Sequence, residues 1–222
     1  MSNLLRIDYM KPTVKSLISC LLILLVGLFS YKYSEIFQWL GLKTYYGKYI
    51  GHKAHAFNLK DYHRGRVSLE DFKGKYLLLT FGFTRCAGVC PLNLENFRNI
   101  FKEFQDQSSS KLEFAFVSFD DLRDDATSVK EFVQRSGIKN IYGLLSGPDK
   151  ALDISHHYKN DIQYEVRKIQ EDETYQINHN GFVYLINPKG VLTLIYLQKN
   201  LNTQRVVEDI LLLIEKEEVL DG

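Results

Sequence analysis

The sequence predicts an α/β protein in which helices pack on a central β-sheet. Short apolar runs of strand length alternate with stretches whose apolar residues recur at helical spacing, and this alternation is typical of α/β architectures. A hairpin signal followed by an amphipathic helix closes the chain. The 222 residues, 45% apolar and 25% charged, give a globular composition with room for one domain and additional segments.

The predicted elements follow one another along most of the chain. They are a hairpin over 56–72, a strand over 75–83, a helix from Pro91 to about Gln105, a strand over 111–120, a helix over 125–137, a short apolar piece over 141–147, a hairpin over 182–197 and a helix over 203–218. The run over 75–83 is apolar throughout, which is typical of a strand buried on both faces. Residues 159–180 are polar and charged without a clear period, and we expect them to form an irregular functional loop.

The most apolar stretch lies near the N-terminus. Residues 16–31 carry no charge and lie between Lys15 and Lys32. As a helix this run would be about 24 Å long, and flanking lysines can snorkel to reach the edges of a hydrocarbon core of about 30 Å. The sequence after it lacks the small residues of a signal-peptide cleavage site. We therefore predict a transmembrane anchor at 16–31.

The anchor defines the predicted organisation of the whole chain. Residues 1–15 are basic and are expected to be cytoplasmic, since positive charge before a span favours the inside. Residues 32–50 read as an aromatic-rich linker suited to the headgroup layer, and 51–222 as the folded domain. The N-terminus lacks an Arg- and Ser-rich transit peptide, which favours a bacterial inner membrane with the domain in the periplasm; the alternative is a mitochondrial inner membrane facing the intermembrane space.

Charge and cysteine content exclude two classes of protein. A net charge of +1 provides no positive field with which to hold nucleic acid phosphates. Three cysteines are too few for a disulfide-stapled scaffold, so a close pair points to chemistry. Cys20 lies inside the predicted anchor and is interpreted as an apolar residue of it.

The close pair is Cys86 and Cys90, in "TFGFTRCAGVCPLN" between a predicted strand and a predicted helix. A structural zinc site would need four ligands, and no second pair exists. A thioredoxin-like redox motif has two intervening residues instead of three, although a wider loop can still close a disulfide. Two thiolates with one imidazole would suit Cu(I), which prefers sulfur. A helix N-terminus at Pro91 would favour the thiolate form.

A copper site of this kind therefore requires a histidine to supply the imidazole. His179 lies at the end of the irregular stretch and just before the last hairpin, where a loop residue anchored to a rigid strand can reach a neighbouring site. His156 and His157 lie in "ALDISHHYKND", which is predicted to be the end of a helix, where a solvated pair is favoured over a ligand. The other histidines precede the first buried strand and could lie anywhere on the surface: His52, His55 and His63.

Three blocks resemble the signature motifs of the Sco/SenC family of copper-binding cytochrome c oxidase assembly proteins. They are "FGFTRCAGVCPLNL", "VSFDDLRDD" and "YQINHNGFVYLINPKG", and the similarity runs from about residue 54 to 216. The resemblance implies a thioredoxin-like sandwich with a central mixed β-sheet. It also implies one copper ion held by Cys86, Cys90 and His179, an N-terminal membrane anchor, and the copper-site subunit of the oxidase as partner.

The chain departs from the family pattern at several positions. Ala87 and Gly88 stand where the family commonly has Pro and Asp, Asp121 replaces a proline, and Asn178 stands where an Asp often precedes the histidine. None of these changes removes an implied ligand.

Two functions remain open at this point. The first is a copper chaperone that assists metallation of the dinuclear copper site of the oxidase. The alternative is a thiol–disulfide oxidoreductase that reduces the cysteines of that site, and only the first requires His179. A peroxidase and a purely structural disulfide are disfavoured, because neither accounts for the motif and the loop histidine together.

Overall fold

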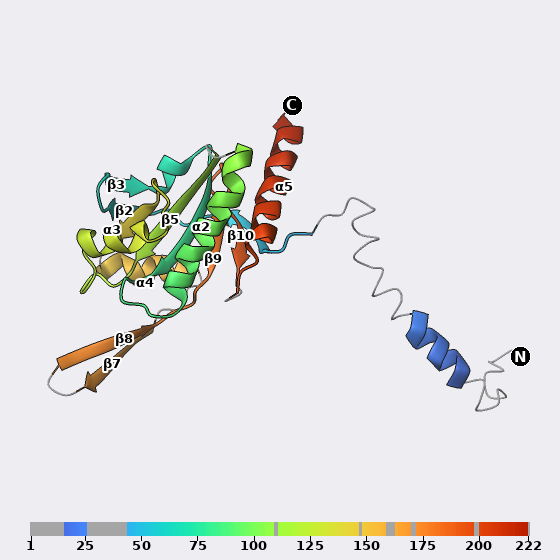
Figure 1. Cartoon of the computed structure of the whole chain (residues 1–222), viewed down its shortest axis with the longest axis horizontal. Helices are drawn as coiled ribbons and strands as arrows, with labels where there is room; N and C mark the ends of the chain where they lie inside the picture. Colours follow the sequence, from blue (N-terminus) through green and yellow to red (C-terminus); the bar gives the residue numbers. More distant parts are fainter. Residues whose placement is uncertain are drawn as a thin grey trace, which may run out of the picture. The chain divides into compact units, whose positions relative to one another are not determined.

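The computed structural model describes residues 16–25, 44–108, 111–146, 148–158, 163–169, 172–197 and 200–221. It divides into two compact units, Met1–Thr44 and Tyr45–Gly222 (Figure 1). In the first unit residues 16–25 are helical, while the remainder of the predicted anchor, 26–31, lies outside the described residues. Among the described helices, none combines the length and apolar content needed to cross a bilayer.

The second unit is built on a mixed β-sheet of eight strands in the order β1-β10-β9-β4-β5-β6-β2-β3. The strands are β1 (Lys48–Lys53), β2 (Asn58–Asp61), β3 (Gly65–Ser68), β4 (Tyr76–Gly82), β5 (Leu112–Ser118), β6 (Tyr142–Leu145), β9 (Val183–Ile186) and β10 (Val191–Tyr196). β4, β5 and β6 pair in parallel, and the remaining pairings are antiparallel. The predicted mixed sheet is confirmed.

Helices cover both faces of this sheet. They are the 3₁₀ helix η1 (Leu69–Phe72) and the α-helices α2 (Val89–Ser108), α3 (Ala126–Gln134), α4 (Pro148–His157) and α5 (Thr203–Asp221). The core on one face packs α2, α3 and α5 against the sheet, and the core on the other packs η1 and α4. β4 lies between the two cores and is buried along its whole length, as its continuous apolar run predicted.

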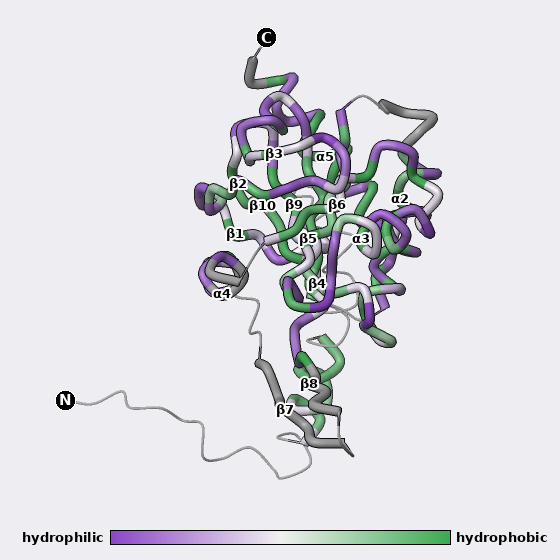
Figure 2. Tube along the Cα trace, turned by 90° about the vertical axis from the view of Figure 1, so that its left-hand side faces the viewer, coloured by the Kyte–Doolittle hydropathy of each residue, from purple (hydrophilic) through white to green (hydrophobic). Residues whose placement is uncertain are grey.

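The distribution of hydropathy follows these layers. Figure 2 shows the central strands β4, β5 and β9 mainly in green, while hydrophilic residues lie on the outer parts of the helices and in the turns. Alternate residues of β4 face opposite cores: Leu78 contributes to one, and Leu77 and Leu79 to the other. The site loop that follows β4 therefore starts from the most firmly packed strand of the domain.

The stretch 159–180 differs from its prediction. In place of an irregular loop the structure has a separate two-stranded hairpin, β7 (Gln163–Ile169) and β8 (Asp172–Asn178), paired from Gln163↔Asn178 to Ile169↔Asp172. The hairpin projects away from the eight-stranded sheet (Figure 1). The sequence reading missed it because charged residues interrupt the alternation in both strands, so that neither segment shows the pattern of a half-buried strand.

The first strand was not predicted either. β1 begins at Lys48, inside the range 32–50 assigned to the linker, and pairs with β10. Just before it, the backbone N–H groups of Tyr46 and Gly47 each donate to the buried carboxylate of Asp209 on α5 at 2.9 Å. These contacts attach the start of the domain to its last helix, which a local sequence pattern does not reveal.

Candidate metal centre

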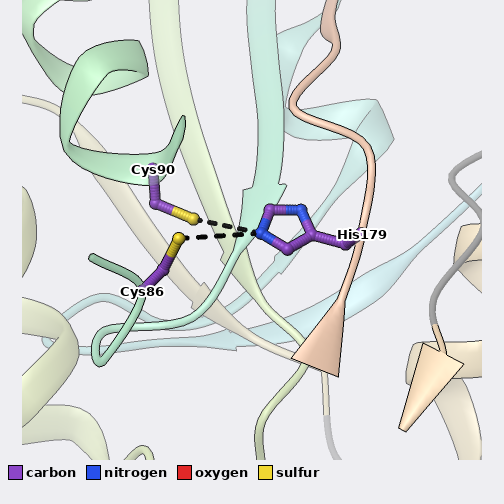
Figure 3. A group of neighbouring side chains, drawn as sticks. All are labelled: Cys86, Cys90 and His179. Atoms are coloured by element: carbon purple, nitrogen blue, oxygen red, sulfur yellow. Dashed lines mark hydrogen bonds between the residues drawn. The ribbon is translucent and has the colours of Figure 1, made fainter. Parts of the chain in front are cut away.

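The two cysteines lie where β4 passes into α2. Cys86 is in the connecting loop and is half-buried, and Cys90 is in the first turn of α2 and is buried. Pro91 fits this first turn because the N–H groups there have no partner within the helix. The two sulfurs face the same point (Figure 3).

His179 completes the group from a distant part of the chain. It directly follows β8, and its Nε2 lies 3.8 Å from Sγ of Cys86 and 3.4 Å from Sγ of Cys90 (Figure 3). Its Nδ1 lies 2.9 Å from the carbonyl oxygen of Asn180. Because a carbonyl can only accept, this contact puts the proton of the neutral ring on Nδ1 and leaves the lone pair of Nε2 facing the sulfurs.

Two phenylalanine rings fix the orientation of the imidazole. The His179 ring meets Phe83 and Phe119 edge to face, with centroids 5.6 and 5.1 Å apart and planes at 71° in both pairs. Phe83 follows β4 and Phe119 follows β5, so the parallel strands supply both rings. Such packing limits ring rotation and holds Nε2 toward the cysteines.

The spacing of the donor atoms fits a single metal ion. In protein sites a borderline metal binds imidazole nitrogen at about 2.0 Å and thiolate sulfur at about 2.3 Å. Two such donors at an angle near 120° lie roughly 3.7 Å apart, by the same bond lengths. The observed 3.4 and 3.8 Å agree with this value. Cys86, Cys90 and His179 therefore form a group that can hold a metal ion.

The two thiols differ in acidity. The pKa of Cys86 is lowered, first by a hydrogen bond from the Cys90 side chain and also by the backbone N–H groups of Cys90 and Gly88, against an opposing effect of burial. The pKa of Cys90 is raised by the same shared proton and by its deeper burial. Cys86 is thus the thiolate and Cys90 the thiol that donates to it. Only one proton then remains to be lost when both sulfurs bind a metal.

This arrangement predicts a pH dependence for the reduced, metal-free protein. An ordinary cysteine thiol has a pKa of about 8.5 and reacts with iodoacetamide only as the thiolate. Cys86 should react at a clearly lower pH, because the hydrogen bond from Cys90 stabilises its thiolate. The measurement is the alkylation rate against pH, with the modified residue identified by mass spectrometry.

Cys90→Ala provides the control for this experiment. It removes the S–H donor, so the midpoint of the Cys86 profile should move to higher pH. A wild-type midpoint near 8.5, unmoved by Cys90→Ala, would contradict the assignment of Cys86 as the thiolate.

A buried carboxylate positions the loop that carries Cys86. Asp124 Oδ2 accepts hydrogen bonds from the backbone N–H of Thr84 at 2.8 Å and from the hydroxyl of Ser118 at 2.6 Å, and Oδ1 accepts from the Thr84 hydroxyl at 2.5 Å. Asp124 itself is held by a turn in which its N–H donates to the carbonyl of Asp120. The block "VSFDDLRDD" therefore supports the block "FGFTRCAGVCPLNL" through the side chain of Asp124. The sequence alone did not assign this role to Asp124.

A second buried network positions the segment after His179. Asn93 on α2 donates through its amide nitrogen to Oγ1 of Thr80 at 2.8 Å and to the carbonyl of Gly181 at 3.1 Å, and Thr80 in turn donates to the carbonyl of Phe182. Asn93 and Thr80 are both buried. The helix that begins at the cysteines thus also fixes the chain that carries the histidine, and no local sequence pattern indicates this role of Asn93.

Close packing at the site requires a glycine at the end of β4. A Cβ at Gly82 would overlap Sγ of Cys90 and lie 2.9 Å from Phe116. Any side chain at this position would displace the buried sulfur. Gly88, in contrast, has open space around the position of a Cβ, so the same restriction does not apply there.

The structure places the remaining histidines away from this group. His63 lies beside Asp61 at the turn between β2 and β3, and His156 and His157 lie exposed at the end of α4 as predicted. His52 is on β1, and His55 is in the connection from β1 to β2.

The fold and the site define the class of protein: a thioredoxin-like α/β domain with a Cys–Cys–His group where the central strand meets a helix. The SCO1/SenC family model matches residues 49–215. The chain belongs to this family.

Individual relatives support this assignment. The human mitochondrial SCO2 homologue is 31% identical over 62% of this chain and 51% of its own length, so the chain spans about half the length of this curated relative. Apo Sco1 from Thermus thermophilus has a TM-score of 0.66 at 25% identity, covering 77% of this chain and 97% of the other. Copper-bound ScoI from Arabidopsis thaliana has a TM-score of 0.65 at 23% identity, covering 73% and 98%.

Proposed function

We propose that the chain is a membrane-anchored copper chaperone that holds one copper ion through Cys86, Cys90 and His179 and assists metallation of the dinuclear copper site of cytochrome c oxidase. The observation that carries the proposal is the position of the His179 Nε2, 3.8 and 3.4 Å from the two sulfurs. Family membership and the copper-bound Arabidopsis relative add support.

The donor set is suited to copper in both oxidation states. Thiolates are soft ligands that favour Cu(I), and imidazole favours Cu(II), so two sulfurs with one nitrogen accommodate either ion. The three residues act as ligands, while Asn180, Phe83 and Phe119 keep the imidazole of His179 in place. A group with only three protein ligands leaves room for an incoming ligand from a partner.

The surface beside the group is suited to such exchange. Cys86 is half-buried, and a depression of 420 Å³ adjoins His179, lined also by Val89 and the exposed Leu92 and Leu197. Exposed apolar side chains next to a metal site are typical of a surface that a partner protein contacts.

The location of the protein is part of the proposal. We infer that residues 16–31 anchor it in a bacterial inner membrane with the domain in the periplasm, on the grounds of their uncharged apolar sequence and the basic residues before them. The expressed full chain should stay with membranes after alkaline extraction. Release of a form that lacks residues 1–30 would indicate a cleaved signal peptide instead.

The test of the copper proposal is an anaerobic titration of the full chain with Cu(I), followed by X-ray absorption of the complex. We expect one copper per chain, with two sulfur ligands and one nitrogen ligand in the first coordination shell. A complex with sulfur ligands alone would exclude His179 from the site, and the absence of stoichiometric binding would end the chaperone proposal.

A second function is favoured by one specific observation. The lowered pKa of Cys86 beside a hydrogen-bonded Cys90 is the arrangement of an attacking thiolate with a resolving thiol. The alternative proposal is therefore a thiol–disulfide oxidoreductase that reduces the oxidase copper-site cysteines. It uses the same pair but gives no role to His179 as a ligand.

A further inference from the structure

A second group of metal-binding side chains lies outside the Cys–Cys–His group. His55, Asp153 and His157 each offer a donor atom within 4.8 Å of the others. His55 Nε2 is 3.3 Å from Asp153 Oδ2, and His157 Nδ1 is 3.4 Å from Asp153 Oδ1. The same Nδ1 of His157 lies 2.9 Å from the backbone carbonyl of Asp153, a hydrogen bond that metal binding through this nitrogen would replace. The carboxylate thus lies within reach of both imidazoles. The sequence alone favoured a solvated histidine pair here, because it did not bring His55 to α4.

The fold holds these residues together through one buried tyrosine. Tyr158 directly follows α4, and its hydroxyl donates to the backbone carbonyl of His55 at 3.0 Å. Tyr158 and Ile154 are buried in the core below, which fixes the inner side of the helix. Asp153 and His157 are four residues apart and so share the neighbouring face. The group is therefore assembled from two segments that are tied to the same core and to each other.

We propose that His55, Asp153 and His157 form a second metal site, for a divalent transition-metal ion that prefers nitrogen and oxygen, namely Zn²⁺ or Cu²⁺. Two imidazoles and a carboxylate are typical ligands for these ions, and the set contains no sulfur to favour Cu(I). His157 is the last residue of α4, where the negative end of the helix dipole adds a favourable field for a cation.

The side chains have the freedom that binding requires. The two imidazoles stack in the structure, with centroids 3.7 Å apart and planes at 10°. Because a ring nitrogen binds metal in the plane of its ring, two parallel stacked rings cannot both point at one ion, so at least one must rotate. The side-chain exposures of 30% for His55 and 47% for His157 allow that rotation. Loss of the stack is therefore an expected consequence of binding.

This inference is independent of the proposed copper chaperone function. The site shares no residue with the group at Cys86, and it would take an ion of different preference. The two proposals can therefore fail separately.

The test uses the full chain in detergent with both site cysteines replaced, Cys86→Ser and Cys90→Ser, titrated with Zn²⁺ alone against a chromophoric competitor. We expect one Zn²⁺ to bind in this background. Adding His55→Ala, His157→Ala or Asp153→Asn should weaken Zn²⁺ binding by at least about tenfold. Replacing a residue that only hydrogen-bonds a metal ligand already lowers metal affinity by about 10- to 100-fold, so the loss of a ligand should not cost less. The wild-type chain with Cys86 and Cys90 oxidised to a disulfide serves as a second form without free thiols at that site, in case the serine variant does not fold.

His156→Ala is the matched control. His156 lies on the same helical turn and is exposed, but it is not part of the group, so its removal should leave Zn²⁺ affinity unchanged. NMR signals of the His55 and His157 rings should shift on binding as the stack opens. A parallel titration with Cu²⁺ shows which of the two ions binds more tightly. Zn²⁺ affinity that is unaffected by both His55→Ala and His157→Ala, or equally weakened by His156→Ala, would overturn the proposal.

Discussion

His179→Ala is expected to abolish Cu(II) binding, to weaken Cu(I) binding less, and to leave disulfide formation between Cys86 and Cys90 nearly unchanged. The substitution removes the one nitrogen donor of the group, and Cu(II) depends on nitrogen more than Cu(I) does. The two sulfurs remain, and a dithiol alone can still hold Cu(I). The measurement is copper stoichiometry for each oxidation state, beside oxidase assembly and reduction of a model disulfide by the same variant.

The cysteine variants complete this comparison. Cys86→Ser or Cys90→Ser should remove both copper binding and thiol–disulfide activity, because both functions need the pair. His156→Ala provides a control in which a histidine outside the group is lost. If His179→Ala retained full copper binding and supported full oxidase assembly, the chaperone proposal would fail and the oxidoreductase proposal would take its place.

The framework of the domain could be predicted from the sequence because its strongest signals are local. The apolar run of β4, the turn Asn187–Gly190 between β9 and β10, and the apolar face of α5 each appear within a few residues of sequence. The structure confirms each of these elements. The anchor at 16–31 stays a prediction, since only residues 16–25 of it are described.

The elements that were missed depend on distant partners. β7 and β8 pair with each other outside the main sheet, so the register of that sheet imposes no apolar alternation on them. β1 is an edge strand whose position is fixed by β10 and by Asp209, more than a hundred residues further along the chain. Such pairings arise from the tertiary fold, and the local sequence does not encode them.

The site could be predicted only in part for the same reason. The close spacing of Cys86 and Cys90 in the sequence identified them as a candidate metal-binding or redox pair. His179 remained one of six candidate histidines until the family resemblance singled it out. The structure adds the residues that hold these three in place. Asn93 and Asp124 are ordinary polar residues in the sequence, and their importance follows from the buried donors and acceptors that they meet.

Asp124→Ala is expected to lower the free energy of unfolding by about 3 kcal/mol or more and to weaken copper binding as well. The carboxylate accepts three hydrogen bonds, two from Thr84 and one from Ser118. Hydrogen bonds to a charged group contribute about 1.5–3 kcal/mol each, and donors left buried without a partner add a further penalty. Loss of the Thr84 contacts would also release the loop that carries Cys86, so that its sulfur no longer faces His179 in a fixed position.

The neighbouring Asp125 offers a matched control for this substitution. Asp125 caps α3, accepting from the backbone N–H of Ser128 at 2.7 Å, and it is exposed. Its replacement by alanine should cost about 1 kcal/mol, as is usual for a helix cap, and should leave copper affinity unchanged because α3 does not carry a residue of the group. The measurements are chemical denaturation and Cu(I) competition for both variants. Equal losses of stability in Asp124→Ala and Asp125→Ala, with copper affinity unchanged in both, would show that the buried carboxylate does not position the loop. A larger loss in Asp124→Ala, accompanied by weaker copper binding, would establish that the "VSFDDLRDD" block supports the cysteine loop through this one side chain.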